Sequence, residues 1–238
     1  LMSFSGQYLI TFTISMLYII GGTGFVVLMD IKRSKRWKGL STNSKLILST
    51  IAGLNLIAFV LLWAIESNNP LTLAPMSLGD QALNAWFHAT VPRSSGFNSL
   101  DLAQMKDAST LVTMLLMFIG GGSMSTAGGI KVGTFIIVLL SVISFLRRED
   151  EIRVFNHSVS QKTSFKAMAV VSITAALIFL GIFSLSLIEP NHQFMDLLFE
   201  AISAACTVGL SRGITGQLQP ASLFIFMLLM FAGRLGPL

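Results

Sequence analysis

The sequence predicts an all-α, polytopic membrane protein with repeated helix–re-entrant pore loop–helix units. The first observation is composition: 53% of the 238 residues are hydrophobic and only 11% are charged, whereas soluble domains carry about 25% charge. Mean hydropathy is +0.75, and a soluble chain of this length could not bury so much apolar surface. The second observation is a set of long charge-free runs. The third is a pair of short apolar segments, each followed by a glycine loop.

The charge-free runs mark the expected spans, because a transmembrane helix needs about 20 apolar residues. They are residues 8–29, 46–65, 108–130, 132–146, 167–188 and 213–233. Four of these runs are long enough alone. The other two, 108–130 and 132–146, are separated only by Lys131.

Basic residues gather in two loops, 32–45 and 147–166. The residues are Lys32, Arg33, Lys35, Arg36, Lys38, Lys45, Arg147, Arg148, Arg153, Lys162 and Lys166. Short loops rich in Lys and Arg stay on the cytoplasmic side of a membrane, so both loops are expected to be cytoplasmic. This asymmetry accounts for the net charge of +5 without a nucleic-acid partner. The single cysteine, Cys206, excludes an internal disulfide and a cysteine-based metal cluster.

Carboxylates gather in the intervening segments, which are poor in Lys and Arg and are expected to face outward. They are Glu66, Asp80, Asp101, Asp107, Glu189, Asp196 and Glu200. An acidic outer mouth would concentrate cations by electrostatic focusing. The alternative is ordinary solvated loop charge, and the sequence leaves both interpretations open.

Two short segments, 78–91 and 192–206, have helical character but are too short to span a bilayer. Pro92 ends the first segment, because the residue before a proline avoids helical geometry. Asn191 is the expected N-cap of the second segment. Both segments lie between an outward and an inward span, so both ends of each are expected on the outer side.

The loop that follows each short helix, at 93–98 and 207–211, is predicted to dip into the membrane and return. Its backbone carbonyls can replace the water around a cation, and the helix C-terminus adds partial negative charge. Oxygen ligands without a carboxylate suit a monovalent cation. An interfacial helix with an ordinary loop is the alternative. The same order of elements recurs in 46–130 and 167–233 in one orientation, which favours a pore.

The stretch 108–146 is too long for one helix, since about 58 Å of helix would face about 30 Å of hydrocarbon. Five glycines interrupt it: Gly120, Gly121, Gly122, Gly128 and Gly129. Successive glycines disfavour helix, so we expect a break and a flexible loop that gates the path. Close helix packing is the alternative. Arg234, at the end of the last span, either lies in the inner half of the bilayer, where a charge is costly and often functional, or reaches to the membrane surface.

Four strings resemble the membrane subunits of the Ktr/Trk/HKT superfamily of potassium transporters. They are PRSSGFNSLD, GGGSMSTAGGIKVGT, CTVGLSRGIT and FAGRLGPL. The Ktr branch is the most similar, on GFN at 96–98 and TVGLS at 207–211, and the resemblance extends over essentially the whole chain. Such subunits have four helix–pore–helix repeats around one pseudo-fourfold pore, and the resemblance implies that this chain is the C-terminal half. The implied divisions are 1–31 as the last helix of a preceding repeat, 32–45 as a cytoplasmic basic loop, 46–146 as the third repeat, 147–166 as a cytoplasmic loop and 167–238 as the fourth repeat.

The resemblance also implies site residues. The selectivity filter would comprise Ser94, Ser95, Gly96, Phe97, Asn98, Thr207, Val208, Gly209 and Leu210. Backbone carbonyls of Gly96, Gly209 and their neighbours would hold K⁺. The gate would comprise Gly120, Gly121, Gly122, Ser123, Ser125, Thr126, Gly128, Gly129 and Arg234.

By resemblance, the parent protein transports potassium across the cell membrane through a channel-like pore whose filter has a single glycine layer. A sodium- or proton-coupled secondary transporter with broken helices is the alternative. No cofactor is expected besides the transported K⁺, with Na⁺ as a modulator. Expected partners are a second copy in a homodimer, a cytosolic nucleotide-binding ring that docks on the basic loops, and membrane lipids, but no nucleic acid. An enzyme is not expected, because no catalytic cluster joins His88 and His192.

Overall fold

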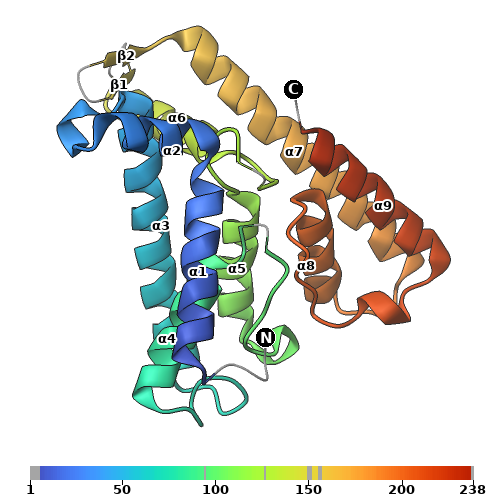
Figure 1. The fold of residues 1–238 in the computed structure, drawn as a ribbon. Coiled ribbons are helices and arrows are strands. Elements are labelled where there is room, and N and C mark those ends of the chain that lie inside the picture. The colour runs from blue at the N-terminus through green and yellow to red at the C-terminus, as the bar shows by residue number, and fades with distance from the viewer. Residues whose placement is uncertain (1–5, 94, 126, 149–151, 155–156, 237–238) are drawn as a thin grey trace.

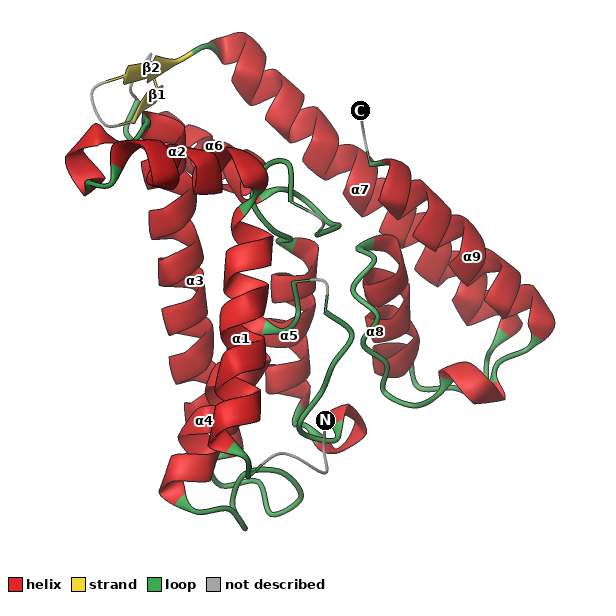
Figure 2. Ribbon diagram, viewed as in Figure 1, coloured by secondary structure: helices red, strands yellow, loops and turns green. Residues whose placement is uncertain are grey.

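The computed structural model describes residues 6–93, 95–125, 127–148, 152–154 and 157–236, and helices dominate them (Figures 1 and 2). Two helices among these residues are long and apolar enough to cross a membrane: α3, Thr42–Glu66, and α7, Gln161–Ile188. Shorter apolar helices are α5 (Asp107–Phe118), α6 (Val132–Leu146) and α9 (Pro220–Leu235). The described residues are therefore all-α, as predicted, apart from one short hairpin.

The first helical region, predicted as a span over 8–29, is bent. Helix α1, Tyr8–Thr23, and helix α2, Phe25–Ser34, meet at an angle of 94°. Gly24 lies between them with φ of +95°, a conformation that only glycine adopts readily. A Cβ atom on Gly24 would overlap the carbonyl oxygen of Ser123. The bend thus leaves room for a loop that lies a hundred residues further along the chain.

The first helix–loop–helix unit consists of α3, α4 (Leu78–Thr90) and α5. Serine N-caps begin two of its helices: the Ser41 hydroxyl accepts from the amide of Ser44, and Ser77 accepts from the amide of Asp80. Helix α4 ends at Thr90, just before Val91 and Pro92, as the proline predicts.

The second unit consists of α7, α8 (Phe194–Ala205) and α9. Helix α8 is the short helix predicted over 192–206. Its N-cap is Gln193 rather than Asn191, and no side chain caps it. Helix α9 begins at Pro220, where proline suits the first turn. The unit therefore repeats the order of the first: long helix, short helix, loop, second helix.

Helix α5 ends at Phe118 and α6 begins at Val132, so the predicted break in 108–146 is confirmed. After α6 the basic loop forms an antiparallel hairpin of β1 (Ile152–Val154) and β2 (His157–Val159), which the sequence analysis did not predict. Short 3₁₀ turns complete the connections. They are η2 (Trp37–Gly39), η3 (Leu102–Gln104) and η4 (Thr215–Gln217).

One buried cluster joins the two units. It includes Leu62 and Phe87 of the first unit, Met117 at the end of α5, and Leu185 and Phe199 of the second unit. Figure 1 shows α8 between α5 and the pair formed by α7 and α9. Side chains in such a core are close-packed, so the two short helices have a fixed relation to each other.

Candidate functional site

The two predicted filter glycines lie against each other. Gly96 has φ of +67° and Gly209 has φ of +84°. A Cβ atom on Gly96 would lie 3.3 Å from the carbonyl oxygen of Gly209 and 3.5 Å from that of Val208. Each glycine follows a short helix whose C-terminus carries partial negative charge. Two loops from distant parts of the chain thus converge at one point with backbone carbonyls beside them.

Side chains of the first unit hold its loop at both ends. Before the glycine, the Ser95 hydroxyl donates to the carbonyl of Val91 (2.8 Å). After it, the Leu100 amide donates to Nε2 of His88 (3.1 Å), and the Asn98 side chain donates to the Leu100 carbonyl (3.0 Å). His88 is almost fully buried, and this bond makes it a structural histidine that ties α4 to the returning chain.

The second unit holds its loop with different side chains. On the short helix α8, the Ser203 hydroxyl donates to the carbonyl of Leu210 (2.6 Å). Glu200, also on α8, accepts from the Ser211 hydroxyl (2.5 Å) and from the Arg212 amide (3.0 Å). Thr207, which begins the loop, has a left-handed φ of +50°. In both units, side chains of the short helix therefore hold the loop that follows it. The first unit uses a histidine, and the second uses a carboxylate and a hydroxyl.

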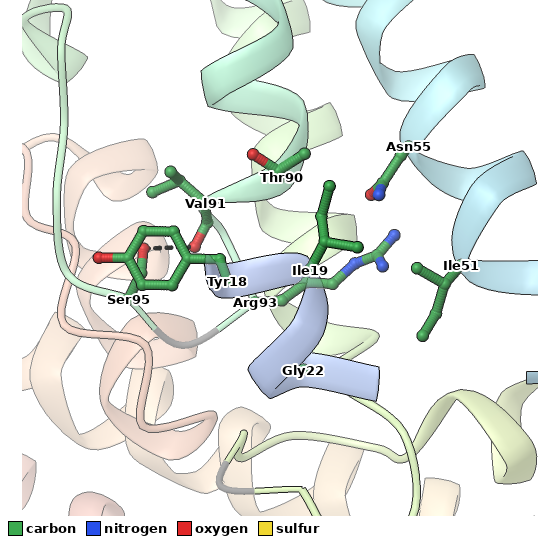
Figure 3. A pocket seen from close by; sticks show the side chains of 9 residues that line it. All are labelled: Tyr18, Ile19, Gly22, Ile51, Asn55, Thr90, Val91, Arg93 and Ser95. Atoms are coloured by element: carbon green, nitrogen blue, oxygen red, sulfur yellow. Dashed lines mark hydrogen bonds between the residues drawn. The ribbon is translucent and has the colours of Figure 1, made fainter. Parts of the chain in front are cut away.

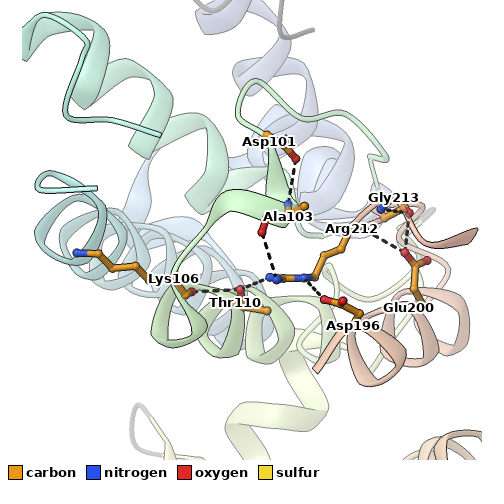
Figure 4. A network of polar contacts seen from close by, with 9 residues as sticks. Asp101, Ala103, Lys106, Thr110, Asp196, Glu200, Arg212 and Gly213 are labelled. Carbon is orange, nitrogen blue, oxygen red and sulfur yellow. Dashed lines mark hydrogen bonds and ion pairs between the residues drawn. The ribbon is translucent and has the colours of Figure 1, made fainter. Parts of the chain in front are cut away.

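Arg212 then joins the second loop to the first unit (Figure 4). Its Nε donates to Asp196 (2.6 Å), and its Nη1 donates to the hydroxyl of Thr110 in the first turn of α5 (2.7 Å). Its Nη2 reaches the carbonyl of Ala103 at 3.4 Å. Only 8% of the Arg212 side chain is exposed, where charge-assisted hydrogen bonds are strong.

Two glutamates occupy equivalent positions in the two units. Glu66, the last residue of α3, accepts from the backbone amide of Lys106, the N-cap of α5 (2.9 Å). Glu189, the C-cap of α7, accepts from the backbone amide of Gln219, the N-cap of α9 (2.7 Å), and from the Ser222 hydroxyl (2.7 Å). Each carboxylate fastens the end of the first long helix to the start of the second, where the helix dipole favours negative charge.

These contacts change the interpretation of the acidic segments. Glu66, Glu189 and Glu200 are only 1%, 5% and 6% exposed. Their oxygens are engaged by amides and hydroxyls, so these three are not ordinary solvated loop charges.

The segment between α5 and α6 packs directly against the second loop. A Cβ atom on Gly128 would overlap the carbonyl oxygen of Cys206 and the hydroxyl of Thr207. The Lys131 side chain donates to the carbonyl of Ala127 (2.5 Å). At the base of the loop, the Ile130 amide donates to the carbonyl of Phe118 (3.0 Å), and the Gly120 amide donates to the carbonyl of Ile130 (2.9 Å). The predicted gating segment and the predicted filter are therefore in contact.

The same segment is also bonded to the bend between α1 and α2. The Gly122 amide donates to the carbonyl of Gly22 (2.7 Å), and the Phe25 amide donates to that of Met124 (3.5 Å). Ser123 provides the carbonyl that faces Gly24. The broken helix α5–α6 and the bent helix α1–α2 thus support each other at the level of the break.

Arg234 lies in the last turn of α9. It lines a cavity of about 660 Å³ together with the predicted filter residues Thr207, Val208, Gly209 and Leu210. The structure thus brings the arginine near the second loop.

The remaining predicted site residues have simpler environments. Ser94 and Thr126 lie outside the described residues. Phe97 is half exposed and its ring lies 6.3 Å from that of Tyr18. The amide of Ser125 donates to the carbonyl of Gly122 (3.2 Å) within the segment.

Sequence reasoning missed Arg212 and the two glutamate contacts. A signal for the glutamates does exist: Lys106-Asp-Ala-Ser109 and Gln219-Pro-Ala-Ser222 match at three-residue spacing, and both serines are fully buried. No sequence pattern predicts the contact between Arg212 and Thr110, because 102 residues separate them. Within the described residues, no group of three or more His, Cys, Asp or Glu side chains forms a metal site.

Fold and site together define a polytopic helical membrane protein with repeated helix–loop–helix units. The family described as TrkH, cation transport protein, matches residues 1–238, and the chain belongs to it. This is a family of transporters, not of enzymes.

Two curated relatives span the whole chain. Ktr system potassium uptake protein B from Bacillus subtilis is 42% identical over 238 residues, which are 100% of this chain and 53% of that protein. The protein of the same name from Vibrio alginolyticus is 38% identical over 241 residues, with 100% and 52% covered. The chain therefore spans about half the length of these relatives.

A solved structure shares the fold. The crystal structure of the potassium transporter TrkH from Vibrio parahaemolyticus matches with a TM-score of 0.78 at 19% identity. The match covers 96% of this chain and 50% of that one.

Proposed function

We propose that this chain contributes two of the loops that form a potassium-selective filter in a membrane uptake protein. The observation that supports this most directly is the convergence of Gly96 and Gly209, each in left-handed geometry at the C-terminal end of a short helix. The curated relatives named above are potassium uptake proteins by name. Carbonyls of Gly96, Gly209 and their neighbours would replace part of the hydration shell of K⁺.

Serine substitutions at the two glycines test the filter. A side chain at Gly96 or Gly209 is strained by the positive φ and crowds the facing loop at 3.3 Å. In the intact protein, Gly96→Ser and Gly209→Ser should each lower the preference of uptake for K⁺ over Na⁺ at least about tenfold, a change of about 1.4 kcal/mol.

Gly216→Ser is the matched control, because no atom lies within 4 Å of a Cβ at this position. Rb⁺ or K⁺ uptake in competition with Na⁺ measures the preference. Retention of K⁺ affinity and K⁺ preference in both filter variants would contradict the filter assignment.

The segment 119–131 is proposed as the gate beneath the filter, with Arg234 as a second gating group. Its supports are the contact of Gly128 with Cys206 and Thr207 and the shared cavity of Arg234. Shortening residues 120–129 should raise ion flux, and unchanged flux would count against a gate.

The proposal extends to the cell membrane as the location, with the basic loops 32–45 and 147–166 on the cytoplasmic side. A homodimer of the full-length subunit, surrounding lipids and a cytosolic nucleotide-binding ring are the proposed partners, with Na⁺ as a modulator. The hairpin β1–β2 lies in one of these basic loops, where a cytosolic ring would dock.

The broken helices support a second candidate, a sodium- or proton-coupled secondary transporter. Two breaks, at Gly24 and at 119–131, contact each other. Tracer fluxes separate the candidates, since a coupled transporter moves K⁺ and its partner ion in a constant ratio and a channel-like pore does not.

A further inference from the structure

A small cavity lies behind the filter loop of the first unit, among α1, α3 and the C-terminal end of α4 (Figure 3). Its volume is about 20 Å³, and one water molecule needs about 10–15 Å³ of such space. Tyr18, Ile19 and Ile51 provide apolar walls, while Asn55 and Arg93 provide polar ones. The cavity is separate from the contact of Gly96 with Gly209, because it lies on the side of the loop that faces α3.

Two side chains direct unmatched polar atoms into this space. Nε and Nη2 of Arg93 and Oδ1 of Asn55 are buried and have no hydrogen-bond partner among the described residues. Figure 3 shows the Arg93 side chain extending toward α3 and ending between Asn55 and Ile51. Buried polar atoms in proteins nearly always have a partner, either protein or ordered water. A guanidinium in a membrane-spanning region has a particularly strong need for one.

The chemistry of these atoms selects the ligand. The guanidinium offers only donors, and the amide oxygen is only an acceptor. A ligand that serves both must accept from Arg93 and donate to Asn55. Water does both, whereas a halide ion accepts only and would face the partial negative charge of Oδ1. We propose that this cavity holds one ordered water molecule that bridges the guanidinium of Arg93 to the side-chain oxygen of Asn55.

The bridge makes Arg93 a positioning residue, a role that rests on the proposed filter function. Arg93 stands three residues before Gly96, and the Ser95 hydroxyl between them is bonded to Val91. Ordering the arginine against α3 fixes the start of the loop, so the carbonyl at Gly96 keeps its direction. The first unit thereby anchors its loop from behind as well as from α4.

A structure of the intact protein at high resolution tests the water directly. Crystals grown with bromide in place of chloride distinguish water from an anion by anomalous scattering. The expected result is one density peak, about 2.7–3.2 Å from an Arg93 nitrogen and from Oδ1 of Asn55, without a bromide signal. An empty cavity, a direct bond between the two side chains, or a bromide peak would overturn the proposal. This test does not depend on transport.

Substitutions at Asn55 test the positioning role. Asn55→Leu removes the acceptor and fills the cavity, and should lower the K⁺-over-Na⁺ preference about tenfold, the effect of losing one hydrogen bond to a charged group. Asn55→Asp keeps an acceptor and should stay within about twofold of wild type. Ser49→Leu, at an exposed position on the same helix, is the control for added apolar volume.

If Asn55→Leu behaves like Ser49→Leu, the positioning role is wrong. Should wild type itself show no K⁺ preference, the filter function fails, while the density in the cavity still decides the water.

Discussion

The two helix–loop–helix units differ most in their second helix. In the first unit the second helix is divided into two parts, α5 and α6, with the segment 119–131 between them. In the second unit α9 is continuous from Pro220 to Leu235. Both second helices begin in the same way, with a backbone amide bonded to a glutamate of the preceding long helix. Their paths differ further along, because the first unit contains the segment 119–131 and the second has no such interruption.

In both units, a glycine after or within the second helix packs against the C-terminal end of α8. Gly128 of the inserted segment packs on Cys206 and Thr207, and Gly233 of α9 packs on the carbonyl of Ala205. The C-terminus of α8 is thus enclosed from two sides. One enclosing segment is a regular helix and the other is an irregular loop. This difference suggests that the first unit supplies a movable part and the second a fixed wall.

The largest expected effect on ion flux is at these two glycines. Gly128→Ala places a Cβ against a backbone carbonyl. Gly128 lies outside the helices, in the stretch between Met124 and Ile130, whose backbone bonds hold the loop on either side. We expect it to move away and raise K⁺ flux about tenfold, a shift of about 1.4 kcal/mol in the open–closed equilibrium. Gly233→Ala should instead destabilise the fold and lower the amount of folded protein, because α9 cannot shift one residue alone.

Flux assays in vesicles and thermal unfolding in detergent separate these outcomes. Gly53→Ala on α3 is the control, since a Cβ there meets nothing within 4 Å. Equal flux changes in the Gly128 and Gly233 variants would remove the distinction between a movable segment and a fixed wall.

Among the hydrogen-bonded contacts, the glutamates should have the largest effect, and it is on stability rather than on ion flux. Glu66 accepts from the side chains of Asn69 (2.6 Å) and Thr72 (2.5 Å) and from the Lys106 amide (2.9 Å). Glu66→Ala leaves these buried donors without an acceptor and should lower the free energy of unfolding by about 3 kcal/mol. Glu189→Ala should cost less, because Glu189 accepts from Gln219 and Ser222 only through Oε1.

Chemical unfolding of the purified variants measures both free energies. Asp107→Ala is the control, an exposed carboxylate in the first turn of α5 whose loss should cost less than about 1 kcal/mol. A loss of stability at Glu189 that is larger than the loss at Glu66 would contradict this prediction.

The connection between the units through Arg212 should have a smaller effect. Arg212→Met removes the bonds to Asp196 and Thr110 and should cost about 2 kcal/mol of stability. In an Asp196→Asn background the same substitution should cost less, because part of the interaction is already lost. A double-mutant cycle on thermal unfolding measures the coupling. Full additivity would mean that the ion pair contributes nothing.

The smallest expected effect is a pH dependence in the second unit. Hydrogen bonds from the Gln219 amide and the Ser222 hydroxyl lower the pKa of Glu189 below its ordinary value of 4.5. The unfolded chain therefore binds this proton first as pH falls, so the stabilisation is complete above pH 4.5 and is lost below it. Glu189→Gln should flatten the decline of stability in that range. An unchanged slope would contradict the assignment.

Much of the fold could be predicted from local signals. Pro92 ends α4 where expected, the glycine run breaks the helix between Phe118 and Val132, and both short helices lie where their length and apolar character place them. These are effects of backbone sterics and hydropathy, which act over a few residues. The bend within the predicted span 8–29 was not predicted, because its position at Gly24 depends on the distant carbonyl of Ser123.

The sequence by itself determined the membrane class, the order of the helices and the two glycine loops, because hydropathy and glycine geometry are properties of the chain nearby. Only the tertiary structure decided that Gly96 contacts Gly209, that Gly128 packs against Thr207, and that Arg212 joins the two units. It also showed that Glu66 and Glu189 are buried anchors rather than surface charges. These features depend on which surfaces meet in space, and close packing between segments far apart in the chain leaves no periodic trace in the sequence.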